Sequence, residues 1–355
     1  MNADLTGASR RGAVQTVVGL VPASRLGVTL PHEHLLCDLT PFLRRPQSED
    51  ERAFADAPIT IDIIGRLRYH PYSNRANLSL TDEAVAIEEA LRYKRAGGSA
   101  IVDATSGGIG RNPAGLARIA QATGLHVVMG SGYYVSSVHP AQFTQSGPER
   151  IAEEIAQEII GGAGATDIRP GIIGEIGLSW PPHPDEYVVL RAAAGAQRLT
   201  GAPLVVHPGR HPDAPRDAMR IVESAGGDPT HTIMCHLCRT IHSWEPLAEL
   251  ARTGCFLEYD LFGQETSYYQ SNPALDMVSD AQRMQWVQRL VDAGYRDRIL
   301  LSDDVANKYQ LVRYGGHGYE HILVNIVPRL RQRGFSEDDV HAFLVDNPAG
   351  ALAFR

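Results

Sequence analysis

Two histidines separated by one residue, His32 and His34, are the first feature of the sequence that could do chemistry. They belong to the stretch Thr29–Leu35, whose apolar residues predict a short strand. Side chains alternate between the two faces of a strand, so we expect His32 and His34 to point one way and Glu33 the other. Two neighbouring imidazoles at the end of an apolar strand are suitable ligands for a first-row metal ion. At this point a chance pair of surface or core histidines is an equally good interpretation.

Further side chains that bind metals stand where other apolar stretches of the sequence end. They are Glu175, His207, His236 and the adjacent pair Asp303 and Asp304. A single buried histidine is more often a core residue than a ligand. The joint occurrence of these donors at the ends of predicted strands favours a metal site, because one fold would bring all of those ends together.

The elements that must position these residues follow a regular rhythm along the chain. Short apolar stretches predict strands at 29–35, 99–103, 126–130, 171–175, 203–207, 231–236, 255–259 and 299–302. Longer stretches between them predict helices at 81–96, 113–123, 148–160, 185–200, 213–225, 244–253, 281–293 and 320–333. Strands that alternate with helices imply a parallel sheet. Eight such repeats without a second glycine-rich dinucleotide turn favour a closed (β/α)8 TIM barrel over an open α/β sheet.

We therefore expect a single domain over residues 1–355, with active-site residues at the carboxyl ends of the barrel strands. Residues 13–21 would form a short strand lead-in, residues 35–80 a long loop with a helix near 61–68, and residues 336–345 an extra C-terminal helix. Six candidate donors exceed the three that one zinc ion requires. They suit two ions roughly 3.5–4 Å apart that share a carboxylate.

Composition narrows the class of protein. The 355 residues are 43% hydrophobic and 21% charged, which is typical of a globular chain. The net charge of −8 argues against a protein that binds nucleic acids or membrane surfaces in general. Met1–Thr6 lacks the basic start of a signal peptide, and four cysteines do not make a disulfide framework, so we expect a cytoplasmic protein. Cys235 and Cys238 are interpreted as structural thiols, because no second C-x-x-C completes a zinc site.

Several motifs together resemble the phosphotriesterase family of the amidohydrolase superfamily, from Val14-Gln-Thr-Val17 to Asn347-Pro-Ala349. The resemblance is greatest to the phosphotriesterase-related branch. It is carried by Leu30-x-His-Glu-His-Leu35, Asn74-x-x-Asn77-Leu78, Gly130-Ser-Gly-Tyr-Tyr-Val135, Ile173-Gly-Glu-Ile-Gly177, His207-Pro-Gly209, Ser302-x-Asp304 and Tyr314-Gly-Gly316. These motifs are specific for the family and much less so for the substrate.

The resemblance implies a binuclear metal centre. His32, His34 and Asp304 would bind the more buried ion, and His207 and His236 the more exposed one. Glu175 stands where many relatives have a carboxylated lysine, and it would bridge the two ions. Alternation along the last strand does not decide between Asp303 and Asp304, because Ile299-Leu-Leu is apolar on both faces. The family pattern assigns the ligand to Asp304.

One departure from the family follows the sixth strand. Relatives often have an acidic residue two positions after the histidine, whereas this chain has Cys238, followed by Arg239. Either the groups that surround the metal ligands are oriented differently here, or the site accepts a different substrate.

The implied activity is hydrolysis by a metal-bridging hydroxide, with Asp304 taking up the proton. Zinc is the expected metal, with manganese, cobalt, iron or nickel as alternatives. The small-molecule substrate would be a lactone, a carboxylic ester or an N-acyl amide, with side activity on organophosphate triesters. We also expect a homodimer that binds neither nucleic acid nor membranes. The alternatives are a non-catalytic binding barrel that retains the metals and a mononuclear amidohydrolase that acts as a deaminase.

Substrate contacts are predicted from side chains that follow the third and eighth strands. Tyr133 and Tyr134 could hold a substrate oxygen, and Lys308 and Arg313 could hold an anionic group. A surface or helix-capping role is the alternative for each.

Overall fold

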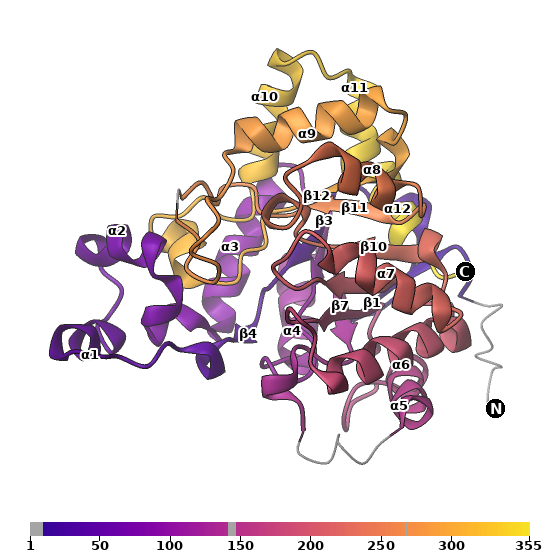
Figure 1. Ribbon diagram of the computed structural model, residues 1–355, viewed down its shortest axis with the longest axis horizontal. Helices are drawn as coiled ribbons and strands as arrows, with labels where there is room; N and C mark the ends of the chain where they lie inside the picture. The colour runs from indigo at the N-terminus through magenta and orange to yellow at the C-terminus, as the bar shows by residue number, and fades with distance from the viewer. Residues whose placement is uncertain (1–9, 141–146, 267) are drawn as a thin grey trace.

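Eight parallel strands form one sheet in which the order in space follows the order along the chain (Figure 1). The structure, a computed structural model, describes residues 10–140, 147–266 and 268–355, so Met1–Thr6 lies outside the described residues. The barrel strands are β3 (Thr29–Glu33), β6 (Ala100–Asp103), β7 (His126–Ser131), β8 (Ile172–Gly177), β9 (Leu204–His207), β10 (Thr232–Met234), β11 (Phe256–Tyr259) and β12 (Ile299–Leu301). The predicted α/β barrel is confirmed.

Helices follow the strands and cover the outside of the sheet (Figure 1). They are α3 (Glu83–Arg95), α4 (Pro113–Thr123), α5 (Pro148–Gly161), α6 (Pro184–Thr200), α7 (Ala214–Ser224), α8 (Trp244–Ala251) and α9 (Asp280–Asp292), followed by α10 (Val327–Gln332), α11 (Glu337–His341) and α12 (Asn347–Leu352). Helix α5 shows how sequence decides the packing. Ile151, Ile155 and Ile159 recur every four residues and are buried, so they form one apolar stripe facing the sheet.

Two apolar clusters separate the inside of the barrel from its outer layer. Helices α3 to α9 contribute to the larger cluster, which therefore fills the space between sheet and helices. The smaller cluster takes alternate strand residues and fills the barrel interior: Ala100, Val102, Val128, Ile172, Val205, Ile233, Cys235, Phe256 and Leu300. Since strand side chains alternate, the residue two positions after an interior residue also faces inward. His207 follows Val205 in this way, at the carboxyl end of the interior.

The amino-terminal lead-in and the long loop contain more structure than the sequence pattern predicted. Residues 13–21 contain the antiparallel pair β1 (Ala13–Thr16) and β2 (Gly19–Pro22). Between 35 and 80, β4 (Cys37–Asp38) pairs with β5 (Ser79–Leu80), and helix α2 (Ile61–Tyr69) stands where a helix was expected.

Helix α1 (Glu49–Ala55) was not predicted. Ser48 caps it, because its side chain accepts a hydrogen bond from the backbone N–H of Glu51. Together α1 and α2 project from one side of the barrel (Figure 1). Within the described ranges, no helix is long and apolar enough to cross a membrane.

Strands β3 and β12 meet at a seam that side chains close. No backbone ladder pairs these two strands, both of which the structure describes in full. Instead the buried carboxylate of Glu33 accepts a hydrogen bond from Ser302 Oγ at 2.7 Å. The backbone N–H groups of Asp303 and Val305 also donate to Glu33, each at 2.8 Å. Glu33 therefore ties the end of the first barrel strand to the loop after the last.

The close approach of β7 and β8 gives a test of this packing. A methyl group on Gly130 would lie 2.2 Å from the carbonyl oxygen of Gly174, so Gly130→Ala forces the strands apart. We expect it to lower the free energy of unfolding by about 1–3 kcal/mol or more, measured by urea denaturation. Gly350→Ala is the control, because a methyl group on this exposed residue of α12 meets open space. Equal, small effects of both changes would contradict the described strand spacing.

Candidate metal centre

The six predicted metal ligands converge at the carboxyl end of the barrel. They come from β3 and its end (His32, His34), from β8 (Glu175), from the end of β9 (His207), and from the loops directly after β10 and β12 (His236, Asp304). All are buried except Asp304, whose side chain is 16% exposed. Strands far apart in the sequence thus bring four imidazoles and two carboxylates together.

One group of donor atoms has the spacing of ligands around an ion. His34 Nε2 lies 3.5 Å from Glu175 Oε1 and 3.4 Å from Asp304 Oδ1. His32 Nε2 lies 3.6 Å from Glu175 Oε2 and 3.9 Å from Asp304 Oδ1. These separations exceed those of hydrogen bonds. Two donors that each lie about 2.1 Å from one tetrahedral ion are roughly 3.4 Å apart, which fits the first group.

The second group contains His207 and His236 and shares Glu175 with the first. His207 Nδ1 lies 2.8 Å from Glu175 Oε2 and 2.9 Å from His236 Nε2. His236 Nε2 lies 3.3 Å from the same carboxylate oxygen. This group is contracted to hydrogen-bond distances, and its donors would separate slightly around an ion. Glu175 therefore stands where a bridging carboxylate would stand.

The electrostatics of the donors also suit a cation. His32 Nε2 is buried and has no hydrogen-bond partner. Burial opposes ionisation of Glu175, but the adjacent His207 and His236 hold its pKa well below the usual value, so it is an anion. Burial lowers the pKa of His207 well below 6.5, which leaves a neutral imidazole with a lone pair for a metal. The residues present thus fit a pair of divalent ions.

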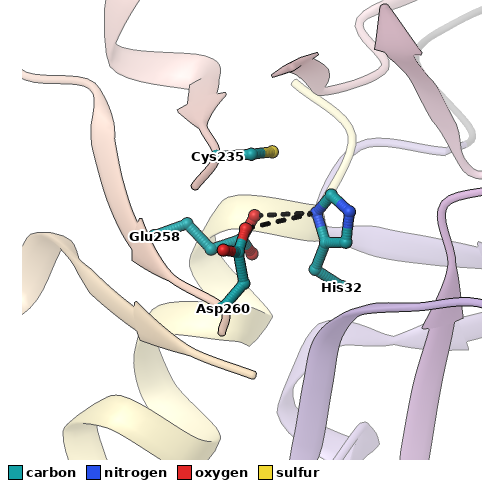
Figure 2. Close-up of side chains that lie close together, drawn as sticks. All are labelled: His32, Cys235, Glu258 and Asp260. Carbon is teal, nitrogen blue, oxygen red and sulfur yellow. Dashed lines mark hydrogen bonds and ion pairs between the residues drawn. The ribbon is translucent and has the colours of Figure 1, made fainter. Parts of the chain in front are cut away.

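Two acidic residues that were not predicted, one in β11 (Phe256–Tyr259) and one directly after it, contact His32 on the side away from the other ligands. Figure 2 shows the carboxylates of Glu258 and Asp260 directed at its imidazole, with Cys235 beside them. Glu258 Oε2 lies 3.0 Å from His32 Nδ1, and Asp260 Oδ2 lies 3.7 Å from it. A carboxylate on one ring nitrogen fixes the ring so that the other nitrogen faces the metal.

Cys235 could join Glu258, Asp260 and His32 in an alternative metal-binding group. Burial, and then Glu258, raise the pKa of its thiol well above the usual value. A protonated thiol is a poor metal ligand. We therefore interpret this group as support for the imidazole, and place the ions on the Nε2 side of His32.

Two of the other imidazoles, His34 and His236, are oriented in the same manner. His34 Nδ1 lies 2.8 Å from Thr105 Oγ1. His236 Nδ1 lies 3.0 Å from Asp260 Oδ1, and Asp260 Oδ2 accepts from the backbone N–H of His236. Asp260 therefore supports two of the four histidines.

Backbone strain is concentrated at two of the predicted ligands. Among the described residues, His236 and Asp304 are the two non-glycine residues with positive φ, at 55° and 46°. Such conformations cost about 1–3 kcal/mol and persist where the surroundings fix them. At Asp304 the strain turns the carboxylate toward His34. Asp303 instead lies fully buried, and burial, then Glu33, raise its pKa well above the usual value.

A cavity opens above the predicted ligands, and most of its wall comes from two loops. Tyr134 lines it, with its hydroxyl 3.3 Å from His207 Nε2. Of the other predicted substrate contacts, Tyr133 lies at a separate surface hollow. Lys308 and Arg313 do not line the cavity, and Arg313 pairs with Glu88 at 3.0 Å on the surface.

The two loops that form the roof are joined by one glutamine. Gln270, in the loop after β11, accepts from the backbone N–H of Tyr72 and donates to Ser73 Oγ, both at 2.9 Å. Tyr72 and Ser73 belong to the long loop after β3. The roof therefore combines segments almost 200 residues apart in the sequence.

Known proteins resemble the chain over its whole length. The sequence model of the Phosphotriesterase family matches residues 12–352. An N-acetyltaurine hydrolase from Danio rerio is 44% identical over 346 residues, covering 97% of this chain and 99% of that protein. Among solved structures, a resiniferatoxin-binding protein from Rhodobacter sphaeroides has a TM-score of 0.92 at 38% identity. The match covers 100% of this chain and 100% of that one. An organophosphorus hydrolase from Deinococcus radiodurans has a TM-score of 0.76 at 26% identity, covering 97% of this chain and 98% of that one.

The donor arrangement predicts how many ions bind. After loading with zinc and desalting, we expect two ions per chain by elemental analysis, and fewer than two in His34→Ala. Chelation should lower the unfolding temperature, because an ion bound only to the folded state stabilises it. A wild-type chain that retains one ion, or none, would contradict the shared role of Glu175.

The seam predicts an effect of Glu33 on both stability and metal binding. In Glu33→Gln an amide NH2 group must face an N–H donor, so we expect a loss of about 1–3 kcal/mol in the free energy of unfolding. Zinc affinity should fall as well, because Glu33 fixes the loop that carries Asp304. Urea denaturation and zinc titration measure the two effects.

Glu186→Gln is a matched control for this variant. The Glu186 carboxylate accepts from the backbone of Ser136, Ser179 and His183, away from the metal ligands. We expect it to lose comparable stability and keep its zinc affinity. Equal zinc affinities in both variants would show that Glu33 does not position the ligand.

Proposed function

The chain belongs to the phosphotriesterase family, and from that premise we propose that it is a binuclear-metal hydrolase of small N-acyl amides. It is a metal-dependent hydrolase of carbonyl substrates. The observation that supports the binuclear centre is the position of Glu175, whose carboxylate lies within 3.6 Å of all four imidazoles, with Oε1 toward His34 and Oε2 toward the other three. The choice of an amide is supported by the whole-chain relatives that are named N-acetyltaurine hydrolases.

We assign the buried ion to His32, His34 and Asp304, and the other ion to His207 and His236, with Glu175 shared. Zinc fits imidazole and carboxylate donors, as do several other first-row metals. When bound, such ions supply Lewis acidity and make water a nucleophile near neutral pH.

The chain's own residues would then move the protons. Asp304 is the most exposed carboxylate of the site, and it lines the cavity. Burial opposes its ionisation, but His34 and His236 hold its pKa below the usual value, so it can accept a proton. We propose that it takes the proton of the attacking water as the carbon–oxygen bond forms. It returns that proton to the amide nitrogen as the carbon–nitrogen bond breaks, which releases a carboxylic acid and an amine.

The experiment that tests the function is a hydrolysis screen of the zinc-loaded chain. The panel contains N-acetyltaurine, a lactone, a p-nitrophenyl ester and paraoxon. We expect the amide to be hydrolysed with the highest kcat/KM. Bound zinc without hydrolysis of any member would instead support a binding protein, and ammonia release with one ion per chain would support a deaminase.

Replacing the proposed proton acceptor should remove turnover and leave the fold intact. We expect Asp304→Asn to lower kcat by about 10²–10⁴-fold, the usual contribution of a general base. Asp303→Asn is the control, because burial and the adjacent Glu33 raise the pKa of Asp303 well above its usual value, and asparagine has nearly the shape of the neutral acid. Circular dichroism and zinc content accompany both kinetic measurements. Near-normal turnover in Asp304→Asn, or a larger loss in Asp303→Asn, would refute the assignment.

A further inference from the structure

We propose that Arg210 and Arg239 form an anion-binding subsite that holds the sulfonate or carboxylate end of the substrate. This inference rests on the proposed function, because it concerns the same cavity. It gives a role to Arg239, which directly follows Cys238, the residue that departs from the family pattern after the sixth strand.

Arg239 is a buried cation without an acidic partner. It follows β10 in a short helical turn, Leu237–Arg239, and its side chain lines the cavity above the metal ligands. Its Nη2 lies 3.0 Å from His207 Nε2 and donates to the carbonyl of Pro208 at 3.3 Å. Its Nη1 is buried and has no hydrogen-bond partner. A buried charged donor left unpaired is costly, so an acceptor from outside the chain is expected here.

Metal binding would leave Arg239 with still fewer acceptors. His207 faces Glu175 and His236 through Nδ1, so that nitrogen would carry the lone pair bound to an ion. A neutral imidazole has one proton, which would then sit on Nε2. An Nε2–H cannot accept from the Arg239 guanidinium. In the metal-loaded protein, Arg239 would therefore lose the His207 acceptor and keep the carbonyl of Pro208, while its Nη1 stays without a partner.

Arg210 lies on the same wall and also lacks a carboxylate. It follows His207-Pro208-Gly209 at the end of β9, and its Nε donates to the hydroxyl of Tyr269 at 2.6 Å. Its guanidinium also lies over the Tyr269 ring, with 5.7 Å to the centroid. These contacts hold the Arg210 side chain in place and leave its terminal amino groups available to a ligand.

Other arginines of the chain pair with a carboxylate of the protein, whereas among the described residues Arg210 and Arg239 do not. Arg111 pairs with Glu158 at 2.7 Å, and the fully buried Arg283 pairs with Asp280 at 2.6 Å. Within the described ranges, neither Arg210 nor Arg239 forms an ion pair with a carboxylate. Their charges are thus directed at the cavity.

The remaining charges of the cavity support an anionic ligand. Its two acidic side chains, Glu175 and Asp304, are both assigned to the ions, and its other charged side chain is Arg68. An anion in such a cavity gains charge-assisted hydrogen bonds, which the planar guanidinium can form in pairs. Because Arg239 contacts His207, the anionic group must be joined to the scissile carbonyl by a short linker.

The test compares substrates that differ only in the end group. N-acetyltaurine, N-acetyl-β-alanine and the neutral N-(2-hydroxyethyl)acetamide present a sulfonate, a carboxylate and a hydroxyl on similar linkers. For the zinc-loaded wild type, we expect a kcat/KM at least tenfold higher for an anionic amide than for the neutral one. The better of the two anions identifies the natural end group.

In Arg210→Gln, this ratio should fall at least tenfold, mainly through KM, and Arg210→Lys should recover part of it. Arg239→Gln should have a similar effect. The matched control is Arg118→Gln, because Arg118 pairs with Glu83 on an outer helix, and its ratio should stay within twofold of wild type. Zinc content and circular dichroism establish that each variant folds and carries its metal.

A binding measurement keeps the inference separate from catalysis. Ethanesulfonate, which cannot be hydrolysed, is titrated calorimetrically into the zinc-loaded chain, and its Kd should weaken at least tenfold in Arg210→Gln. An unchanged Kd and substrate ratio in folded Arg210→Gln would overturn the subsite. A wild type that binds ethanesulfonate through Arg210 but hydrolyses no amide would instead refute the proposed function and retain the subsite.

Discussion

The hydrogen bonds that Glu33 accepts across the seam are the constraint on which the geometry of the site depends. A barrel of parallel strands must join its first strand to its last, and here a carboxylate does so where a backbone ladder is missing. The backbone groups on both sides of Asp304 donate to that carboxylate. They hold Asp304 in its strained conformation, with φ at 46°. Closure of the barrel and placement of a metal ligand are thus achieved by the same contacts.

A second layer of acids makes the imidazole cluster possible. Four buried histidines would repel one another if protonated and would need hydrogen-bond partners if neutral. Glu258 in β11 and Asp260 directly after it meet this need for His32 and His236, while Thr105 does so for His34. Three of the four rings thereby have one nitrogen fixed by the protein, and the other is left for an ion.

Local pattern was sufficient to predict the strands and to propose candidate donors at their ends, because strand position and face follow from residue spacing. The choice of Asp304 over Asp303 rested instead on the family resemblance. Glu258 and Asp260 carry the same signal as His32 and His34, two polar residues at i and i+2 on the end of an apolar strand. The strand predicted over 255–259 ends at Tyr259, whose side chain faces the helices, so the prediction did not include these two acids. Helix α1 could not be predicted in this way. Its end is held by Asn74, which donates to the carbonyls of Phe54 and Ala57 from 17 or more residues away in the sequence.

The direction in which the Arg239 side chain points could not be predicted from the sequence either, because it depends on the left-handed turn at His236. The sequence showed that an arginine follows the sixth strand, and only the fold shows that it enters the cavity. The result is a chain of net charge −8 in which three arginines line the cavity above the metal ligands. Overall charge therefore says little about the ligand of a recessed site, where nearby groups dominate.

The metal ligands and the walls of the cavity belong to different parts of the fold, and this separation has a consequence for evolution. The residues that would activate water lie on the strands of the sheet or directly after them, whereas Gln270 joins two loops that shape the space above them. Loops accept insertions and exchanges that a sheet does not. Lineages built on this barrel can therefore acquire new specificities by remodelling the roof, while inheriting their reaction chemistry unchanged.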